Sequence, residues 1–374
     1  MLSKDRQSLL KRPTRRNFLQ LATVATLSGL TLSGCGWTLA EVRPTPPSPG
    51  DRNKLFIYTW TNYTDDELLD RFKEITGIKA VVDVFDSNEA MLARLQASGG
   101  GAYSIIYPSD YMVRKMVELD LLVKLDFERI IGINRLFSKF LNPIYDPNNL
   151  HSIPLSWGTT GLIYNSKKLS KVPEDWSYLW QYKDKLSRRM TLLNDVREVM
   201  GATLKMLGYS YNSTNPQEIK KAYETLVELK PSIASFSSDA WRSQILTGDL
   251  WVAMCYSSDA VDIMAENPDL QYVLPKSGSS LWTDTLAIPK TAPNLEGAYA
   301  WINFMLEADV AAQICERLSF ATPNQKAFKL LSRDIQEDQS LFPEQSALER
   351  CEGLAPVDEV SELYDRYWTQ LTSA

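Results

Sequence analysis

The sequence is poor in the residues on which most enzymes and metalloproteins depend. Histidine occurs once, as His151, so a zinc site or a histidine-based triad would have to be built on one imidazole. The four cysteines show no metal-ligand spacing, and no G-x-S-x-G, P-loop or paired-glycine dinucleotide motif is present. We therefore expect a protein that is not an enzyme and that holds neither a metal nor a cofactor.

Long apolar runs are also lacking. The run at residues 21–32 has about a dozen residues diluted by Thr and Ser, whereas a membrane-spanning helix needs ~20. It follows a twin-arginine pattern at residues 14–20 and ends in a lipoprotein cleavage box at residues 32–35. This order predicts a twin-arginine lipoprotein signal peptide at residues 1–34 and lipidation of Cys35. We expect an exported, periplasmic protein that is anchored to a membrane through Cys35 and its proline-rich tether, residues 35–52.

The chain has no excess of positive charge. It carries 40 Lys and Arg against 46 Asp and Glu, a net charge of −6. Residues 1–34 contain six basic residues and one acidic residue, so without them the net charge is −11. An acidic exported protein is a poor nucleic-acid binder and a plausible host for cations. We expect no nucleic-acid partner.

Disulfide bonds are limited by the small number of cysteines. Cys255, Cys315 and Cys351 remain after Cys35, and three cysteines cannot all pair. Cys315 and Cys351 both lie in the C-terminal part, so a disulfide between them and two free thiols are both open alternatives. Cys255 lies in an apolar run and is expected to be a buried thiol.

Alternating strand and helix patterns are what the sequence does have. Residues 54–60 predict a strand, residues 64–67 a capping box that opens a helix, and Gly77 the end of that helix. A strand at residues 80–85, a helix at 87–97 and a strand at 103–107 are expected next. This order predicts an α/β fold with a parallel sheet. Ligands of such sheets bind beyond the carboxyl ends of the strands, where the chain has aromatic and short polar residues at 60–63 and 109–111.

A second α/β region follows the long strand expected at residues 152–165. Its expected elements are a strand at residues 190–194, a helix at 216–229 and strands at 250–256 and 271–274. Residues 282–289 then return the chain to the first region, and helices from residue 296 onward close it. Two crossings favour two hinged lobes. We expect lobe 1 at residues 53–159 and 283–328 and lobe 2 at residues 160–282 and 329–374.

The returning strand places Trp282 and Asp284 two positions apart. Side chains with this spacing lie on the same face of a strand, so an indole ring and a carboxylate face one space together. That pair suits an organic cation, because the ring attracts it through its quadrupole and the carboxylate pairs with it directly. A core Trp beside a turn Asp is the alternative.

Seven separated segments resemble one family. They are residues 58–63, 86–89, 108–111, 152–158, 195–198, 282–289 and 322–324. In order and spacing they are similar to the bacterial spermidine/putrescine-binding proteins, which are periplasmic receptors of polyamine ABC importers in extracellular solute-binding protein family 1. The resemblance runs from Lys54 to Leu371. It implies a two-lobe, type II periplasmic-binding fold with a polyamine in the interdomain cleft and a membrane permease as partner. A monomer is expected.

The resemblance also implies which residues contact the ligand. Its aromatic and polar wall falls on Trp60, Thr61, Tyr63, Ser109 and Tyr111, its acids on Asp195, Glu198 and Asp284, and its stacking ring on Trp282. Departures from the family pattern are Asn62 in place of an acid, Tyr256 in place of a Trp, Phe320 in place of a Tyr, and no matching Gln around Leu354. Asp259 falls where putrescine-preferring members have an Asp. These differences leave spermidine and putrescine as open alternatives.

Several of these residues also have an ordinary structural interpretation. Asp195 and Glu198 could be a helix cap and a surface ion pair with Arg197, and Asp259 could be a turn or cap residue. Trp157 is expected in the core. A receptor for another small solute and a polyamine sensor that docks on a signalling protein are the alternative functions.

Overall fold

The computed structural model describes residues 52–61, 63–97 and 101–373. The signal peptide, Cys35, almost all of the tether and Asn62 therefore lie outside the described residues. Within the described part of the chain, no helix combines the length and the apolar character needed to cross a membrane.

The first α/β region has the expected parallel sheet. Strand β1 (Lys54–Trp60) pairs in parallel with β2 (Lys79–Phe85) and with β3 (Ile105–Ile106). The helices that follow these strands are α2 (Asp66–Thr76), α3 (Asn88–Ala97) and α4 (Asp110–Glu118). The predicted α/β order is confirmed, and the carboxyl ends of β1 and β3 lie at one edge of this sheet.

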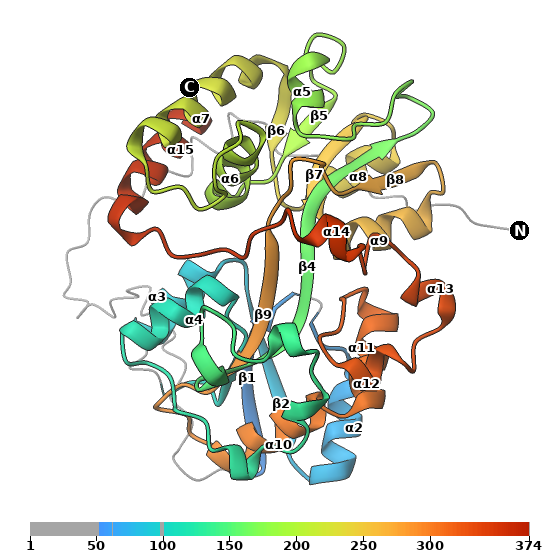
Figure 1. Ribbon diagram of the computed structural model, residues 1–374. Helices are drawn as coiled ribbons and strands as arrows, with labels where there is room; N and C mark the ends of the chain where they lie inside the picture. The colour runs from blue at the N-terminus through green and yellow to red at the C-terminus, as the bar shows by residue number, and fades with distance from the viewer. Residues whose placement is uncertain (1–51, 62, 98–100, 374) are drawn as a thin grey trace, which may run out of the picture. The chain divides into compact units, whose positions relative to one another are not determined.

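Two long antiparallel strands connect this region to the second one. Strand β4 (Ser152–Asn165) pairs with β9 (Leu281–Ala287), and the two lie side by side in Figure 1. Near its start β4 lies beside the part of β9 that pairs with β3, and near its end it pairs with β7 (Val252–Tyr256) and β8 (Leu270–Val273). Every residue of β4 is buried, because both of its faces are covered along its whole length.

The second region is built on β5 (Met190–Leu192), which pairs in parallel with β6 (Ile233–Phe236) and β7. Its helices are α5 (Ser177–Gln181), α6 (Val196–Met206), α7 (Pro216–Leu229), α8 (Trp241–Leu246) and α9 (Ser257–Glu266). Of the C-terminal helices, α15 (Ser361–Ser373) packs on α6 and α7.

The other C-terminal helices are α10 (Leu295–Met305), α11 (Ala308–Leu318), α12 (Gln325–Phe328), α13 (Arg333–Gln336) and α14 (Gln345–Leu348). Short 3₁₀ turns occupy Phe127–Arg129, Ile133–Arg135, Ser138–Phe140, Pro147–Asn149, Lys230–Ser232 and Asp358–Val360. Helix α11 packs on α12 through a small cluster that includes Cys315 and Leu331.

Two large hydrophobic cores give the chain its two lobes. One core draws its buried residues from positions 55–157 and 282–321, with Trp301 among the largest. The other draws them from positions 162–254 and 354–371, with Tyr211 and Tyr364 among the largest. Each lobe therefore has apolar burial of its own, and among the described strands only β4 and β9 connect the two regions of the sheet.

The structure also differs from the sequence-based expectations in local detail. Asp65 caps α2, not Thr64, because the extended backbone of Asp65 lets its carboxylate accept a hydrogen bond from the Leu68 amide at 2.9 Å. Gly77 ends the helix in the left-handed conformation, as predicted.

Cys255, Cys315 and Cys351 are all free thiols. Trp157 is a core residue, as predicted, and donates its indole N–H to the Thr322 carbonyl.

Candidate functional site

Asp284 lies on β9, on the side of the strand that faces the ends of β1 and β3. Its carboxylate accepts hydrogen bonds from the Tyr63 hydroxyl, which follows β1, and from the Ser109 hydroxyl, which follows β3, the latter at 2.6 Å. The carboxylate is almost completely buried, at 6% exposure. Tyr63 and Ser109 follow β1 and β3, as the sequence predicted, and Asp284 meets both of them from β9.

Burial raises the pKa of Asp284 to about 6, against the lowering effect of the hydrogen bonds from Ser109 and Tyr63. Within the described residues, no Lys or Arg pairs with this carboxylate. It is therefore a buried acid that has hydrogen-bond donors but no counter-charge.

Asn88 holds the loop that carries Ser109 and Tyr111. Its side-chain amide donates to the Ser109 hydroxyl at 3.0 Å and to the Tyr111 hydroxyl at 3.1 Å, and its carbonyl accepts from the Ser109 amide. Tyr111 in turn donates to Glu89 at 3.0 Å. In the sequence, Asn88 belongs to one of the segments that resemble the family, residues 86–89. Its position at the start of α3, directly after β2, was the signal that pointed to this edge of the sheet.

Trp282 lies two residues before Asp284, near the start of β9, where it contacts lobe 2. Its ring makes an edge-to-face contact with Tyr256, with 6.0 Å between centroids. Within the described residues, its buried indole N–H has no hydrogen-bond partner. Gly158 on β4 pairs with Trp282 and leaves the space that the ring fills, since a Cβ there would lie 2.2 Å from the ring.

Asp195 and Glu198 begin helix α6 in lobe 2. Asp195 is the N-cap and accepts hydrogen bonds from the amides of Arg197 and Glu198, so its structural interpretation as a cap is correct. Arg197 forms no surface ion pair with them; it donates to the Asn212 side chain and the Ala355 carbonyl. A role as a helix cap does not prevent Asp195 from binding a ligand. Acids at the N-terminus of a helix, such as Asp195 and Glu198, lie at the open end of that helix.

Glu198 is fully buried, at 1% exposure. It accepts hydrogen bonds from the hydroxyls of Tyr211 and Ser280, both at 2.8 Å. Burial and then the charge of Asp195 raise the pKa of Glu198 to about 7. Burial is also the main cause of the raised pKa of Asp195. Tyr211 and Ser280 orient this acid and were missed from the sequence, where neither lies near Glu198.

Asp259 differs from the other acids because it has a cationic partner. It lies in the first turn of α9 and pairs with Arg242 at 2.7 Å. Burial raises the pKa of Asp259, while Arg242 lowers it. The interpretation of Asp259 as a turn or cap residue is therefore wrong, because it lies inside α9, whose N-cap is Tyr256. Its charge is already compensated by Arg242.

Three further predicted residues are Phe320, Trp60 and Thr61. Phe320 packs against the Tyr63 ring with 4.1 Å between centroids, and Trp60 packs on Phe85 with 4.4 Å. The Trp60 indole N–H is buried without a partner among the described residues. Thr61 is exposed.

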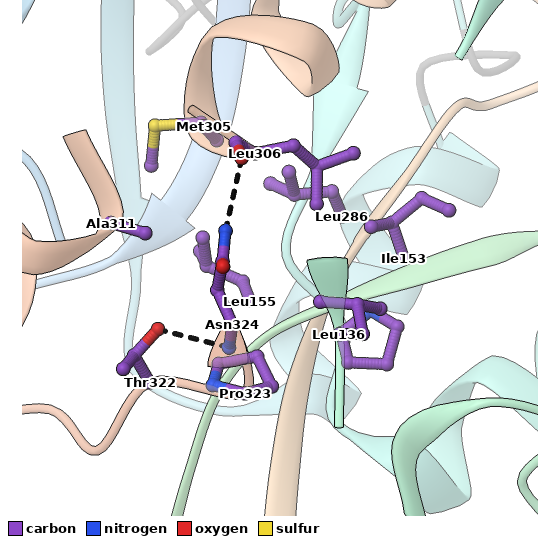
Figure 2. A pocket seen from close by; sticks show the side chains of 11 residues that line it. Leu136, Ile153, Leu155, Leu286, Met305, Leu306, Ala311, Thr322, Pro323 and Asn324 are labelled. Atoms are coloured by element: carbon purple, nitrogen blue, oxygen red, sulfur yellow. Dashed lines mark hydrogen bonds between the residues drawn. The ribbon is translucent and has the colours of Figure 1, made fainter. Parts of the chain in front are cut away.

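The segment Thr322-Pro323-Asn324 has a structural role. Figure 2 shows the Asn324 side chain donating to the Leu306 carbonyl, at 3.0 Å, and the Thr322 hydroxyl accepting from the Asn324 amide, at 3.1 Å. The pocket drawn there is apolar and has a volume of about 10 Å³, roughly the space of one water molecule. This pocket lies inside lobe 1 and is too small for an organic ligand.

The sequence and the fold are similar to those of known proteins. Residues 67–343 match the bacterial extracellular solute-binding proteins. The spermidine/putrescine-binding periplasmic protein of Salmonella typhimurium is 37% identical over 322 residues, which cover 86% of this chain and 92% of that protein. Spermidine/putrescine-binding periplasmic protein 1 of Haemophilus influenzae is 34% identical over 361 residues, covering 96% and 99%.

A solved structure agrees with these sequence relatives. The spermidine/putrescine ABC transporter substrate-binding protein of Streptococcus pneumoniae superposes with a TM-score of 0.78 and 37% identity, covering 86% of this chain and 99% of that one. Sequence and backbone thus match the same group along nearly the whole folded region. The chain belongs to the family of bacterial extracellular solute-binding proteins, in the group that contains the spermidine/putrescine-binding proteins.

Proposed function

We propose that the protein captures a polyamine, spermidine or putrescine, between its lobes and delivers it to the membrane permease of an ABC importer. The observation that carries this proposal is the set of buried acids without a cationic partner, Asp284 on one side and Glu198 on the other, with the Trp282 ring on the strand between them. The relatives are substrate-binding components of transporters, and the chain is a binding protein and not an enzyme.

A polyamine supplies the positive charges that these buried carboxylates lack. Each ammonium loses its hydration on entry, and a buried carboxylate replaces that hydration with an ion pair. The methylene runs between the ammoniums need apolar walls, which a ring such as Trp282 provides. The face of the same ring also attracts an ammonium through a cation–π contact of about 0.5–2 kcal/mol. Closure of the lobes strengthens each ion pair because it excludes water.

The finer parts of the proposal rest on the sequence. Lobe 1 comprises residues 53–159 and 283–328, and lobe 2 comprises residues 160–282 and 329–374. Lipidation of Cys35 anchors the receptor, which works as a monomer, and the tether of residues 35–52 holds it off the membrane surface. The ligand-contacting residues are those that the resemblance identified, with Asp259 contributing least because Arg242 already neutralises it.

Isothermal titration of residues 36–374 with putrescine, cadaverine, spermidine and spermine at two salt concentrations tests the proposal. We expect one-to-one binding that weakens with salt, since ion pairs carry it. No heat with any of the four, on a folded and ligand-stripped sample, would overturn the proposal and favour a receptor for another solute. Transport of labelled polyamine by cells with and without the gene separates an importer from a sensor.

Gly158→Ala should weaken polyamine binding about tenfold or more, because the new methyl group would lie 2.2 Å from the Trp282 ring and force it to move. Gly101→Ala is the matched control, since the nearest atom to its new methyl group is 3.9 Å away. Titration of both variants with spermidine checks the prediction. Equal affinities for Gly158→Ala and Gly101→Ala would mean that the Trp282 ring does not contact the ligand.

A further inference from the structure

Residues 166–189 of lobe 2 form a basic segment in an acidic protein. They contain seven Lys and Arg against three Asp and Glu, a net charge of +4, whereas residues 35–374 together carry −11. The basic segment leaves strand β4 and returns to strand β5, with helix α5 between them. The residues that we expect to contact the ligand all lie outside it, so its positive charge needs another explanation.

Backbone pairing places both ends of the basic segment at one edge of the sheet. Strand β4 ends beside the start of β7, where the Asn165 amide donates to the Trp251 carbonyl at 2.9 Å. The Trp251 amide donates to the Arg189 carbonyl, directly before β5, at 2.8 Å. The Arg188 amide donates to the Ser232 carbonyl, directly before β6, at 2.7 Å. We call this the amino edge of lobe 2, since β5, β6 and β7 all begin there; the end of β4 and α5 lie near the top of Figure 1.

Most basic side chains of this segment are exposed and lack an acidic partner. The exposed ones are Lys167, Lys168, Lys171, Lys185, Arg188 and Arg189. Among the residues that the structure describes, only Lys167 of these six has a carboxylate within ion-pair distance, that of Asp269 at 4.0 Å. By contrast, eight arginines outside the segment pair with Asp or Glu. The unpaired state is therefore particular to this surface.

Two of the three acids in the basic segment lie away from the amino edge. Glu174 pairs with Lys276 at 2.6 Å, and Asp175 accepts a hydrogen bond from the Ser277 hydroxyl at 2.6 Å. Residues 276–277 follow the end of β8, which is remote from the edge because β8 starts there, beside Asn165. The acids around the edge are Asp184, Asp249 and Asp269, with Glu228 and Glu266 at the ends of α7 and α9. The seven basic residues outnumber these five acids.

Apolar groups accompany the positive charges. Val172 follows Lys171 in the loop after β4 and is 49% exposed. Trp251 is partly buried, and the Arg189 guanidinium lies 5.8 Å from the centroid of its ring. Lys and Arg beside Trp and aliphatic side chains are typical of surfaces that lie on anionic lipid headgroups.

We propose that the amino edge of lobe 2 binds the surface of an anionic phospholipid bilayer. Lipid phosphates supply the negative charges that the unpaired Lys and Arg lack. The basic side chains are spread over an exposed edge and do not converge on one buried point, which suits a charged surface better than a single small anion. The proposed lipid anchor keeps a bilayer within reach of this edge. The inference goes beyond the proposed function and does not depend on polyamine binding.

Binding at the amino edge leaves the candidate site open. Strand β7 runs from this edge to Tyr256, and β5 runs from it toward Asp195, the cap of α6. The five residues of β7 separate its two ends by roughly 15 Å. The receptor can therefore lie on lipid through one end of lobe 2 while the opposite end of the same strands holds a ligand. The anchor alone fixes a distance from the bilayer, whereas this contact also fixes an orientation.

The test is co-sedimentation of the lipid-free chain, residues 36–374, with vesicles of phosphatidylcholine that contain phosphatidylglycerol and with vesicles of phosphatidylcholine alone. We expect binding to the anionic vesicles only, and weaker binding as salt is added. The triple variant Lys167→Gln, Lys168→Gln, Lys171→Gln should bind the anionic vesicles about tenfold or more weakly and should bind spermidine as the wild type does. Wild-type protein that binds neither kind of vesicle would overturn the inference.

The triple variant Lys73→Gln, Lys79→Gln, Lys326→Gln is the matched control, because it removes the same charge from exposed lysines of lobe 1. It should keep the wild-type affinity for the anionic vesicles. Equal losses in both triple variants contradict a role of the amino edge, since net charge then explains the binding. Inorganic phosphate that abolishes vesicle binding at equal ionic strength would point to a site for a free anion instead. Spermidine binding without vesicle binding refutes only this inference, and the reverse result refutes only the proposed function.

Discussion

Asp284→Asn is expected to lower the affinity for spermidine roughly tenfold to a hundredfold. Asparagine has the shape of aspartate, so Ser109 can still donate to its carbonyl oxygen, and the Tyr63 hydroxyl can accept from its amide. What is lost is the negative charge that meets a desolvated ammonium. The affinity change therefore reports on the ion pair and not on the shape of the cleft.

The same substitution should not destabilise the ligand-free protein. Asp284 has a raised pKa, so its folded environment disfavours the charged form that is present at neutral pH. Removing the charge should leave the thermal unfolding temperature at pH 7.5 equal to or above that of the wild type. A variant that binds weakly and yet melts no earlier separates loss of function from loss of fold.

Asp120→Asn is the control for net charge. Asp120 is 84% exposed on the side chain, pairs with Lys290, and has a positive φ of 57°, a backbone conformation that Asn adopts readily. It should bind spermidine as the wild type does. If Asp284→Asn binds as tightly as Asp120→Asn, the polyamine lies elsewhere and the proposed cleft is wrong.

Much of the fold follows from local patterns in the sequence. Strand β4 and helix α7 have the predicted bounds, because a long β-prone run and a proline at the first helical turn are strong local signals. Strand β3 is shorter than expected, since pairing with β1 and β9 and not local propensity decides where a ladder ends. The cap of α2 lies at Asp65 and not at Thr64, because the Asp65 carboxylate accepts the hydrogen bond from the Leu68 amide.

The site was predictable only in part. The spacing of Trp282 and Asp284 on one strand, and the polar residues after β1 and β3, follow from period and topology. The resemblance supplied Asp195 and Glu198, for which the local pattern favoured a helix cap. No local pattern connects Glu198 with Tyr211 or with Ser280, because those contacts depend on how the lobe folds.

Binding should also depend strongly on pH. Asp284 and Glu198 have pKa values raised to about 6 and about 7, and a bound ammonium requires each of them to be ionised. Polyamine amines stay protonated throughout this range, since primary ammoniums lose their proton near pH ~10. Between about pH 7.5 and pH 5, spermidine affinity should fall about a hundredfold or more, because binding must displace protons from both acids.

The stability of the ligand-free protein should change in the opposite direction. An acid whose folded pKa lies above its unfolded value binds more protons in the folded state, so its contribution favours folding at low pH and is lost as the pH rises through the folded pKa. For Asp284 the difference between about 6 and 3.8 corresponds to on the order of 3 kcal/mol. Between about pH 4 and pH 7 this contribution lowers the unfolding temperature, while the stabilisation by spermidine grows.

Proton release measures this coupling directly. Titration with spermidine in two buffers of different ionisation enthalpy should show about one proton or more released at pH 6 and almost none at pH 8. Asp284→Asn should release fewer protons at pH 6, because one of the two titrating acids is gone, and Asp120→Asn should release as many as the wild type. Equal release at pH 6 and pH 8, together with tight binding at both, would mean that the ammoniums do not meet these buried carboxylates. The acids would then have only a structural role, and the cationic ligand would bind to another surface.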